Sequence, residues 1–361
     1  MSSIDDLETP ALLLDVSTMR RNVDRMARFY ATAGVQHRPH VKTTKCLEMT
    51  RIQRDAGVIG FTCQTSAELK LLLGDGATNL LWAQQPVGPS RVKLAVAANR
   101  DAQVICVVDS VAVAAPLAAC AEASGMQIPV LLEIDTGQGR CGVTAQKAPD
   151  LAARVADLRG LRLIGVMTHE GHLSRGQPSM AELHERGLEA GVTLADTAIA
   201  LRKEGHAIEV VSVGSTPGAT SAPLVPGVTE ARAGTYVLND ANQVSLGTCG
   251  LDACALSILA TVVSNHGREH AIIDAGLKAV SGDPAVGAGG YGKVLGTRDL
   301  HFPEANEEHG FICGTGRSAL SVGDRIRIVP NHACGTVNMW SCYWVVDGDR
   351  VVDRWPIAAR Y

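Results

Sequence analysis

The stretch Gln103-Val104-Ile105-Cys106-Val107-Val108 is an apolar run of strand length. An Ala- and Leu-rich segment with apolar residues spaced by three and four follows it at Ala112–Ala123, and a second apolar run occupies Pro129–Ile134. A buried strand, a helix and a further buried strand in this order are typical of a parallel sheet covered by helices. This stretch therefore predicts an α/β fold whose sheet is buried on both faces.

The same alternation extends in both directions from this unit. A long helical pattern recurs at Ala181–Lys203. The candidate strands are Gln36–Val41, Val58–Thr62, Asn79–Ala83, Gln103–Val108, Pro129–Ile134, Leu161–Met167, Ile208–Val213 and Gly227–Val237. Eight strand–helix units over roughly 200 residues predict a (β/α)8 TIM-like barrel. A doubly wound open sheet is the alternative, but no Gly-x-Gly-x-x-Gly opens a helix after an early strand.

The pattern changes after residue 245, where strand-like runs dominate. Gly- and Asp-rich turns between these runs are typical of a mostly antiparallel β domain. Residues 10–16 form one more strand, which we expect to pair with this domain, and Ala285–Tyr291 is a Gly-rich loop. The runs are Ala255–Val263, His270–Ile273, Arg325–Val329, Tyr343–Val346 and Arg350–Val352. The predicted domains are therefore a barrel over 17–245 and a β domain over 1–16 plus 246–361.

Composition restricts the class of protein. The 361 residues fit two domains, and a net charge of −4 gives no electrostatic reason to expect nucleic acid or a membrane surface as partner. The sequence has no apolar run of 18 or more residues, and its N-terminus lacks the basic and apolar regions of a secretory signal. Its ten cysteines are scattered, without the spacing of a disulfide framework. We therefore expect a reduced, cytoplasmic location.

Polar residues follow the predicted strands, where barrel enzymes carry their catalytic groups. A lysine at the mouth of a barrel, such as Lys42, can hold an aldehyde cofactor as a Schiff base, although it could also be a surface lysine like Lys45. The strand-end residues are Lys42, Cys63, Gln64, Gln84, Asp109, Arg140, His169, Gly214, Ser215 and Thr216.

Three loops among these residues could bind a ligand or take part in catalysis, but each also has an ordinary structural explanation. The Gly214–Gly218 loop offers backbone N–H groups and hydroxyls for a phosphate, but is also a plausible Gly/Pro turn. In the Gly137–Gly142 loop, Arg140 stands among glycines, whose small size would let a ligand approach closely. The alternative is an ordinary turn with a solvated arginine. The third loop carries His169 and His172, which could form a metal site, act as bases or lie in a polar loop.

A His-x-Cys pair, His332 and Cys334, lies far along the chain. On a strand, side chains two residues apart point to the same side and can share a metal. The alternative is a buried histidine beside a core cysteine. Two ligands do not complete a zinc site, but catalytic metals often keep a position open for water or substrate.

Taken together, these motifs resemble the D-threonine aldolase and D-serine dehydratase family of fold-type III pyridoxal phosphate (PLP) enzymes, which have an alanine-racemase-like N-terminal barrel. The resemblance extends from Thr9 to the C-terminus. Its motifs are Arg38–Thr43, Glu133–Val143, Gly214–Pro217, Asp274–Lys278, Glu308–Gly310 and Pro330–Cys334.

The resemblance implies roles for single residues. Lys42 would hold PLP, Arg140 would lie near its phenolic oxygen and His169 against its ring. The phosphate would be bound by Gly214, Ser215 and Thr216. Either Arg232 or Tyr236 would face the pyridine nitrogen. His332 and Cys334 would hold a divalent metal (Mn, Mg or Zn) close to the 3-hydroxyl of the substrate.

The resemblance leaves the reaction open between two lyases that act on a D-3-hydroxy amino acid. The first expectation is a D-threonine aldolase, which forms glycine and an aldehyde, with His169 or His172 as the base. The alternative is a D-serine or D-threo-3-hydroxyaspartate dehydratase, which forms a 2-oxo acid and ammonia. The Gly137–Gly142 loop with Arg140 resembles the loop of aldolases, whereas the His-x-Cys pair resembles that of dehydratases. A racemase and a non-catalytic PLP carrier fit less well, and a homodimer is expected.

Overall fold

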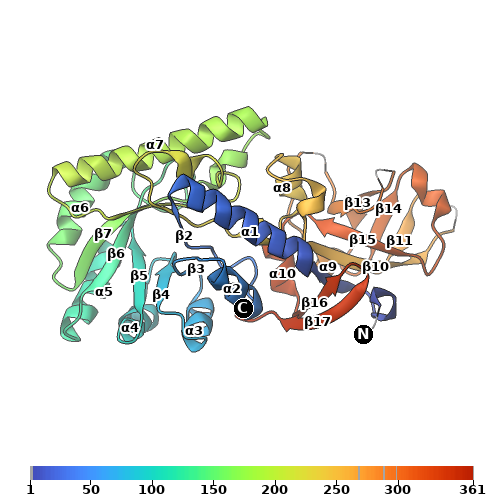
Figure 1. The fold of residues 1–361 in the computed structure, drawn as a ribbon, viewed down its shortest axis with the longest axis horizontal. Coiled ribbons are helices and arrows are strands. Elements are labelled where there is room, and N and C mark those ends of the chain that lie inside the picture. Colours follow the sequence, from blue (N-terminus) through green and yellow to red (C-terminus); the bar gives the residue numbers. More distant parts are fainter. Residues whose placement is uncertain (1–2, 267–268, 288, 298, 361) are drawn as a thin grey trace. The chain divides into compact units, whose positions relative to one another are not determined.

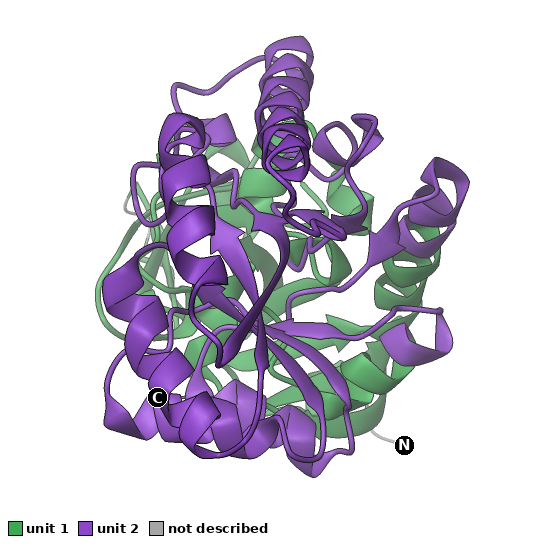
Figure 2. Ribbon diagram, turned by 90° about the vertical axis from the view of Figure 1, so that its left-hand side faces the viewer, with its two compact units in different colours: residues 1–25, 43–52, 235–361 green, residues 26–42, 53–234 purple. Residues whose placement is uncertain are grey.

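The computed structural model describes residues 3–266, 269–287, 289–297 and 299–360. The chain forms two compact units (Figure 2). The first unit consists of residues 1–25, 43–52 and 235–361, and the second consists of residues 26–42 and 53–234. The domain limits expected from the sequence, 17–245 and 1–16 plus 246–361, stay a prediction.

The second unit contains an eight-stranded parallel sheet with the order β2-β9-β8-β7-β6-β5-β4-β3 (Figure 1). Its strands are β2 (Gln36–His37), β3 (Phe61–Cys63), β4 (Asn79–Trp82), β5 (Gln103–Val108), β6 (Ile128–Glu133), β7 (Leu161–Met167), β8 (Val210–Val213) and β9 (Glu230–Ala231). The predicted α/β class and barrel-type sheet are confirmed. The first and last runs are shorter than expected. Gln36–Val41 contains only the two-residue strand β2, and Gly227–Val237 contains only the two-residue strand β9 and a 3-10 turn at Thr235–Val237.

Hydrogen bonds beyond β2 connect the two edges of this sheet. The Val41 N–H donates to the Thr62 carbonyl, and the Thr62 N–H donates to the Pro39 carbonyl. Buried Arg38 strengthens this closure, because its guanidinium donates to Glu230 at 2.8 Å and to the Asn79 side chain at 2.7 Å. The sheet therefore returns on itself, and the chain after β2 is held at the mouth of a barrel.

Helices connect the strands of this unit. The helices of the first 234 residues are α1 (Val16–Ala33), α2 (Leu47–Asp55), α3 (Ser66–Gly74), α4 (Pro89–Ala98), α5 (Val111–Ala123), α6 (Ala148–Ala156) and α7 (Met180–Lys203). The predicted helical patterns at Ala112–Ala123 and Ala181–Lys203 coincide with α5 and α7. A capping box between Ser179 and Glu182 fixes the start of α7.

The first unit contains a mixed sheet. Its strands are β1 (Ala11–Asp15), β10 (Leu256–Ser264), β11 (Ala271–Ile273), β12 (Gly292–Val294), β13 (His301–Ala305), β14 (Gly310–Cys313), β15 (Arg325–Pro330), β16 (Cys342–Asp347) and β17 (Arg350–Pro356). Most pairs are antiparallel. Strand β1 pairs antiparallel with β10 and parallel with β16, which confirms that the segment at residues 10–16 belongs to this sheet. Three short helices accompany it: α8 (Ala241–Ser245), α9 (Leu277–Val280) and α10 (Ala333–Met339).

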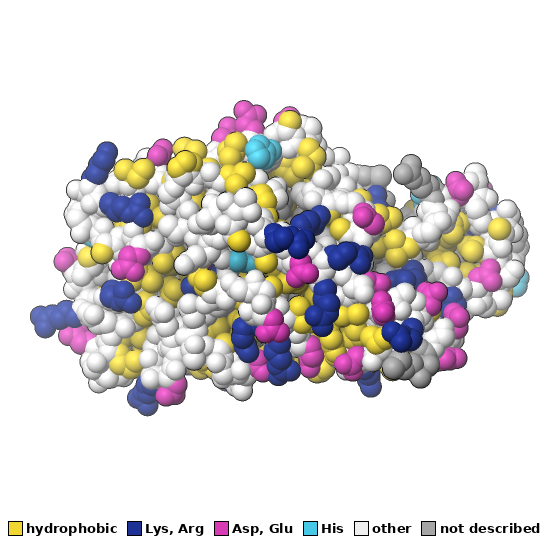
Figure 3. All heavy atoms as spheres, viewed as in Figure 1, with side chains coloured by type: hydrophobic (Ala, Val, Ile, Leu, Met, Phe, Trp, Pro, Cys, Tyr) yellow, Lys and Arg dark blue, Asp and Glu magenta, His cyan; other side chains and the backbone are white. Residues whose placement is uncertain are grey.

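The surface carries charges of both signs. Figure 3 shows Lys and Arg side chains interspersed with Asp and Glu on the face that it presents. Within the described residues, no helix combines the length and the apolar character needed to cross a membrane.

Candidate active site

Polar residues from separate strands meet in one cavity at the mouth of the barrel unit. The cavity is lined by His40, Lys42, Gln64, Ala83, Arg140, Met167, His169, Gly214 and Arg232. Of the strand-end residues identified in the sequence, Lys42, Gln64, Arg140, His169 and Gly214 are thus brought together. His40 was not singled out, although it lies two residues before the lysine.

His169 is held in one tautomer. Its Nδ1 lies 2.6 Å from the carbonyl oxygen of Gly214, so Nδ1 carries the proton and donates it. Burial and the nearby Lys42 ammonium lower the pKa of His169 to about 3. The ring is therefore neutral, and Nε2 offers a lone pair of low basicity.

Glu170 binds the backbone N–H of the same residue, Gly214. Both of its carboxylate oxygens accept the Gly214 N–H, at 3.0 and 3.1 Å. Burial raises the pKa of Glu170, while Arg232 opposes this rise. Sequence analysis had not given Glu170 a role, since its partner is 44 residues away.

Arg232 is buried at the back of the cavity. Its guanidinium donates to the Ser212 hydroxyl and to the Thr168 carbonyl. Burial lowers the pKa of Arg232, while Glu170 and Glu230 raise it. Tyr236, the other residue considered for the pyridine nitrogen, is buried in the first unit and is not among the lining residues described.

The Gly214–Gly218 loop has the properties of a phosphate cradle. The Thr216 hydroxyl is buried and has no hydrogen-bond partner within the described part of the chain. The Ser215 hydroxyl accepts the Gly218 N–H at 3.0 Å, which fixes the turn. A Cβ on Gly218 would lie 2.9 Å from Leu173, so glycine is needed there for packing. A buried hydroxyl without a hydrogen-bond partner among the described residues suits an anionic phosphate group, such as that of PLP, bound at this loop.

Arg140 belongs to a second polar network. Its guanidinium lies 3.8 Å from Glu133, a largely buried carboxylate whose pKa is raised by burial. Glu133 lies with Asp109 and Cys141 in a group whose possible ligand atoms are within 4.8 Å of one another. Gln85 donates to both carboxylates. Because Gln85 already donates to one oxygen of each carboxylate, we do not assign a metal to this group.

His172 lies against the arginine loop. A Cβ on Gly137 would come within 2.9 Å of His172 Nε2, so the glycine permits this close approach. Its Nδ1 is buried without a partner in the described structure, and burial lowers the pKa of the ring. Arg175 donates to the Gly137 and Gln138 carbonyls at 3.2 and 2.7 Å, which holds the loop. His172 is not among the residues that line the Lys42 cavity.

His332 and Cys334 meet at the start of a helix. The expectation that they lie on a strand is wrong, because β15 ends at Pro330 and His332 is the N-cap of α10. The buried Asp240 carboxylate causes this turn, since it accepts the Ala333 N–H at 3.0 Å and caps the new helix.

The pair is nevertheless brought together. The two side chains are hydrogen-bonded to each other, and the Cys334 thiol lies 3.0 Å from the Thr43 hydroxyl. Asp283 Oδ2 lies 2.9 Å from His332 Nδ1, which orients the imidazole ring. A thiol and an imidazole oriented by a carboxylate form a donor set that suits a divalent metal. Asp283 was not identified from the sequence.

Comparisons with known proteins agree with this architecture. Residues 14–241 match the model of the alanine racemase N-terminal domain, and residues 255–346 match that of a serine dehydratase domain. D-threo-3-hydroxyaspartate dehydratase from Delftia sp. is 37% identical, over 97% of both chains. D-threonine aldolase from Arthrobacter sp. is 31% identical, over 98% of this chain and 93% of that protein.

Solved structures of a dehydratase and of an aldolase are also similar to this chain. The Delftia dehydratase superposes with a TM-score of 0.92 at 34% identity, with 99% of each chain covered. D-threonine aldolase from Filomicrobium marinum superposes with a TM-score of 0.89 at 28% identity, over 98% of this chain and 95% of the other. The chain therefore belongs to the D-threonine aldolase and D-serine dehydratase family of fold-type III PLP-dependent enzymes, whose members named here are lyases.

Proposed function

We propose that this chain is a PLP- and metal-dependent dehydratase of D-3-hydroxy amino acids, which forms a 2-oxo acid and ammonia. The observation that carries the proposal is the His332–Cys334 pair with Asp283 behind the histidine. Solved variants of D-threo-3-hydroxyaspartate dehydratase replace a histidine and a cysteine two positions apart, and the cysteine variant is described as metal-free. The same spacing in this chain supports the same use.

The residues of the Lys42 cavity and of the neighbouring Gly214–Gly218 loop suit the cofactor. Lys42 would hold its aldehyde carbon, and Thr216 and Ser215 would bind its phosphate. His169 would lie against the ring, and Arg140 and Arg232 would supply positive charge at its polar edges. Bound PLP would withdraw electrons from the substrate Cα, and a bound divalent metal would polarise the 3-hydroxyl.

The position of the required base distinguishes the two candidate reactions. Elimination of water requires a base at Cα, and Lys42 is the residue that we assign to this proton. Cleavage between Cα and Cβ requires a base at the 3-hydroxyl. His169 suits that second task poorly, because its pKa is lowered to about 3 by burial and by Lys42. We therefore place the dehydratase, the alternative expected from the sequence, before the aldolase.

The D-threonine aldolase remains the second candidate. His172 approaches the Gly137–Gly142 loop closely, and its Nδ1 has no hydrogen-bond partner among the described residues, so His172 is a candidate base in that region. A dehydratase and an aldolase are each similar to nearly the whole chain, so sequence similarity alone does not distinguish the two activities.

The products separate the candidates. Enzyme loaded with PLP and Mn²⁺, Mg²⁺ or Zn²⁺ would be incubated with D-serine, D-threonine and D-threo-3-hydroxyaspartate. We expect equal amounts of ammonia and 2-oxo acid from at least one substrate, and none from the L isomers. Glycine and an aldehyde without ammonia would establish the aldolase instead.

We also propose a homodimer and a cytoplasmic location. The family resemblance supports the dimer. The ten free cysteines support a reducing compartment. Sedimentation analysis of the holoenzyme tests the first proposal, because a monomer at micromolar concentration would refute it.

A further inference from the structure

A second pocket lies in the first unit and takes no part in the chemistry described above. It has a volume of about 630 Å³, within the range of about 300–1,000 Å³ typical of small-molecule sites. Its lining comes from α8, the turn at Leu251, strands β12 and β13, and Asn331.

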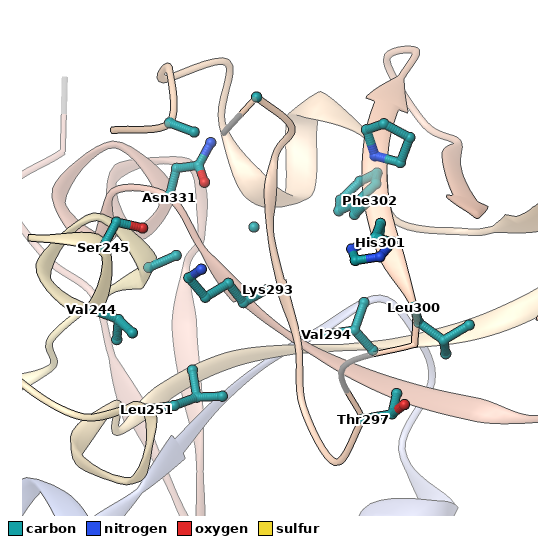
Figure 4. A pocket seen from close by; sticks show the side chains of 15 residues that line it. Val244, Ser245, Leu251, Lys293, Val294, Thr297, Leu300, His301, Phe302 and Asn331 are labelled. Carbon is teal, nitrogen blue, oxygen red and sulfur yellow. The ribbon is translucent and has the colours of Figure 1, made fainter. Parts of the chain in front are cut away.

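The lining combines an apolar floor with polar groups. Val244, Leu251, Val294, Leu300 and Phe302 provide the apolar surface. Figure 4 shows Lys293 extending into the pocket toward the side formed by Val244 and Ser245, with His301 and Phe302 on the opposite side. Ser245, Thr297 and His301 add polar groups to the lining.

The formal charge among the described lining residues is of one sign, positive. The described lining contains Lys293 but neither Asp nor Glu. No hydrogen bond or ion pair joins Lys293 to any described residue, whereas Lys278 in the same unit is paired with Glu308. A cation beside apolar surface, without a protein anion, is complementary to an amphipathic anion.

Hydrogen bonds fix the wall of the pocket. The Asn242 side chain accepts the Val286 N–H at 2.6 Å and donates to the Pro284 carbonyl at 3.1 Å. Asn331 donates to the Gly290 carbonyl at 2.7 Å. Gly292 lets β12 approach its partner strand β15 closely, since a Cβ at this position would clash with the Val329 carbonyl. These bonds tie Pro284 and Val286 to α8 and Gly290 to Asn331.

We propose that this pocket binds a small amphipathic monoanion, with an apolar body of one or two rings and a carboxylate or sulfonate facing Lys293. The proposal does not rest on the dehydratase assignment, because it concerns binding at residues without a role in that reaction.

The test is a calorimetric titration of the PLP-loaded protein with 2-naphthoate and with its uncharged analogue 2-naphthamide. We expect one 2-naphthoate per chain and weaker binding of the amide. Lys293→Met should weaken 2-naphthoate binding by about tenfold or more and leave the amide unchanged, since a charge-assisted contact is lost. Lys293→Arg should retain binding. Leu251→Ser should weaken both compounds.

Lys278→Met is the matched control, because it removes the same charge elsewhere in the same unit and should change neither affinity. Equal affinities of wild type and Lys293→Met for 2-naphthoate would overturn the proposal. An equal loss in Lys278→Met would also overturn it, since a general charge effect would then explain the binding. Absence of one-to-one binding in the wild type would overturn it as well.

Discussion

His169 and Gly214 are joined by a 2.6 Å hydrogen bond from the ring Nδ1–H to the backbone carbonyl, across 45 residues of sequence. Glu170, the next residue, accepts the N–H of the same glycine. One glycine thus connects the histidine expected against the cofactor ring with the loop expected to bind its phosphate. The residues that we propose to contact the ring and the phosphate of the cofactor are therefore linked through Gly214.

Lys42→Ala tests whether the lysine holds the cofactor. Without the amine, PLP can bind only through its non-covalent contacts, so we expect loss of the visible absorbance of the bound cofactor and of activity. Absorbance spectra and product assays measure both. Lys93→Ala, an exposed lysine of the same unit, is the control and should behave as wild type. A Lys42→Ala protein with normal absorbance and turnover would remove the basis of this account.

Thr216→Val tests the phosphate cradle. The hydroxyl has no partner in the described protein, so its loss should leave the melting temperature of the apoprotein nearly unchanged. A hydrogen bond to a charged group contributes about 1.5–3 kcal/mol, so we expect PLP affinity to fall by about ten- to a hundredfold. Equilibrium dialysis of PLP and thermal unfolding measure the two effects. Unchanged PLP affinity would exclude Thr216 from the cradle.

Asp283→Asn tests the orientation of the proposed metal ligand. The carboxylate holds His332 through Nδ1, and loss of such a partner typically costs ten- to a hundredfold in metal affinity or activity. We therefore expect weaker Mn²⁺ or Zn²⁺ binding with PLP still bound, and rescue of turnover at higher metal concentration. His332→Ala should show no such rescue. Metal-independent turnover of chelated wild-type enzyme would contradict a catalytic metal.

His37 makes stability dependent on pH. Burial lowers the pKa of His37 to about 3, while the unfolded chain has the ordinary value of 6.5. The unfolded state therefore gains a proton between these values that the folded state does not. The free energy of unfolding should fall as pH drops through this window, by up to about 1.4 kcal/mol per pH unit for this residue.

His37→Gln should reduce that slope, as urea unfolding of the apoprotein between pH 7 and pH 4 would measure. His184→Gln, at an exposed position on α7, is the control and should leave the slope unchanged. Parallel curves for wild type and His37→Gln would show that His37 does not titrate in this way.

Central barrel strands such as β5 and β6 could be predicted because they are apolar runs bounded by polar turns, whereas β2 and β9 have two residues each and include polar side chains. Strands β12, β13 and β14 were missed, since they are short and β13 and β14 pair with a shift in register. The helix start at Ala333 depends on Asp240, 93 residues earlier, and no local pattern reveals this cap. Asp283 was missed for the same reason, because its partner His332 is 49 residues away.

The isotope content of the products tests the central claim, elimination started by Lys42, most directly. The holoenzyme with metal would be given D-threonine or D-threo-3-hydroxyaspartate carrying deuterium at Cα, and the products analysed by mass spectrometry. Elimination breaks the Cα–D bond, so the account predicts ammonia, a 2-oxo acid and release of the original deuterium to water. Glycine that retains its deuterium, together with an aldehyde, would contradict it, because the Cα–Cβ bond would then have broken instead.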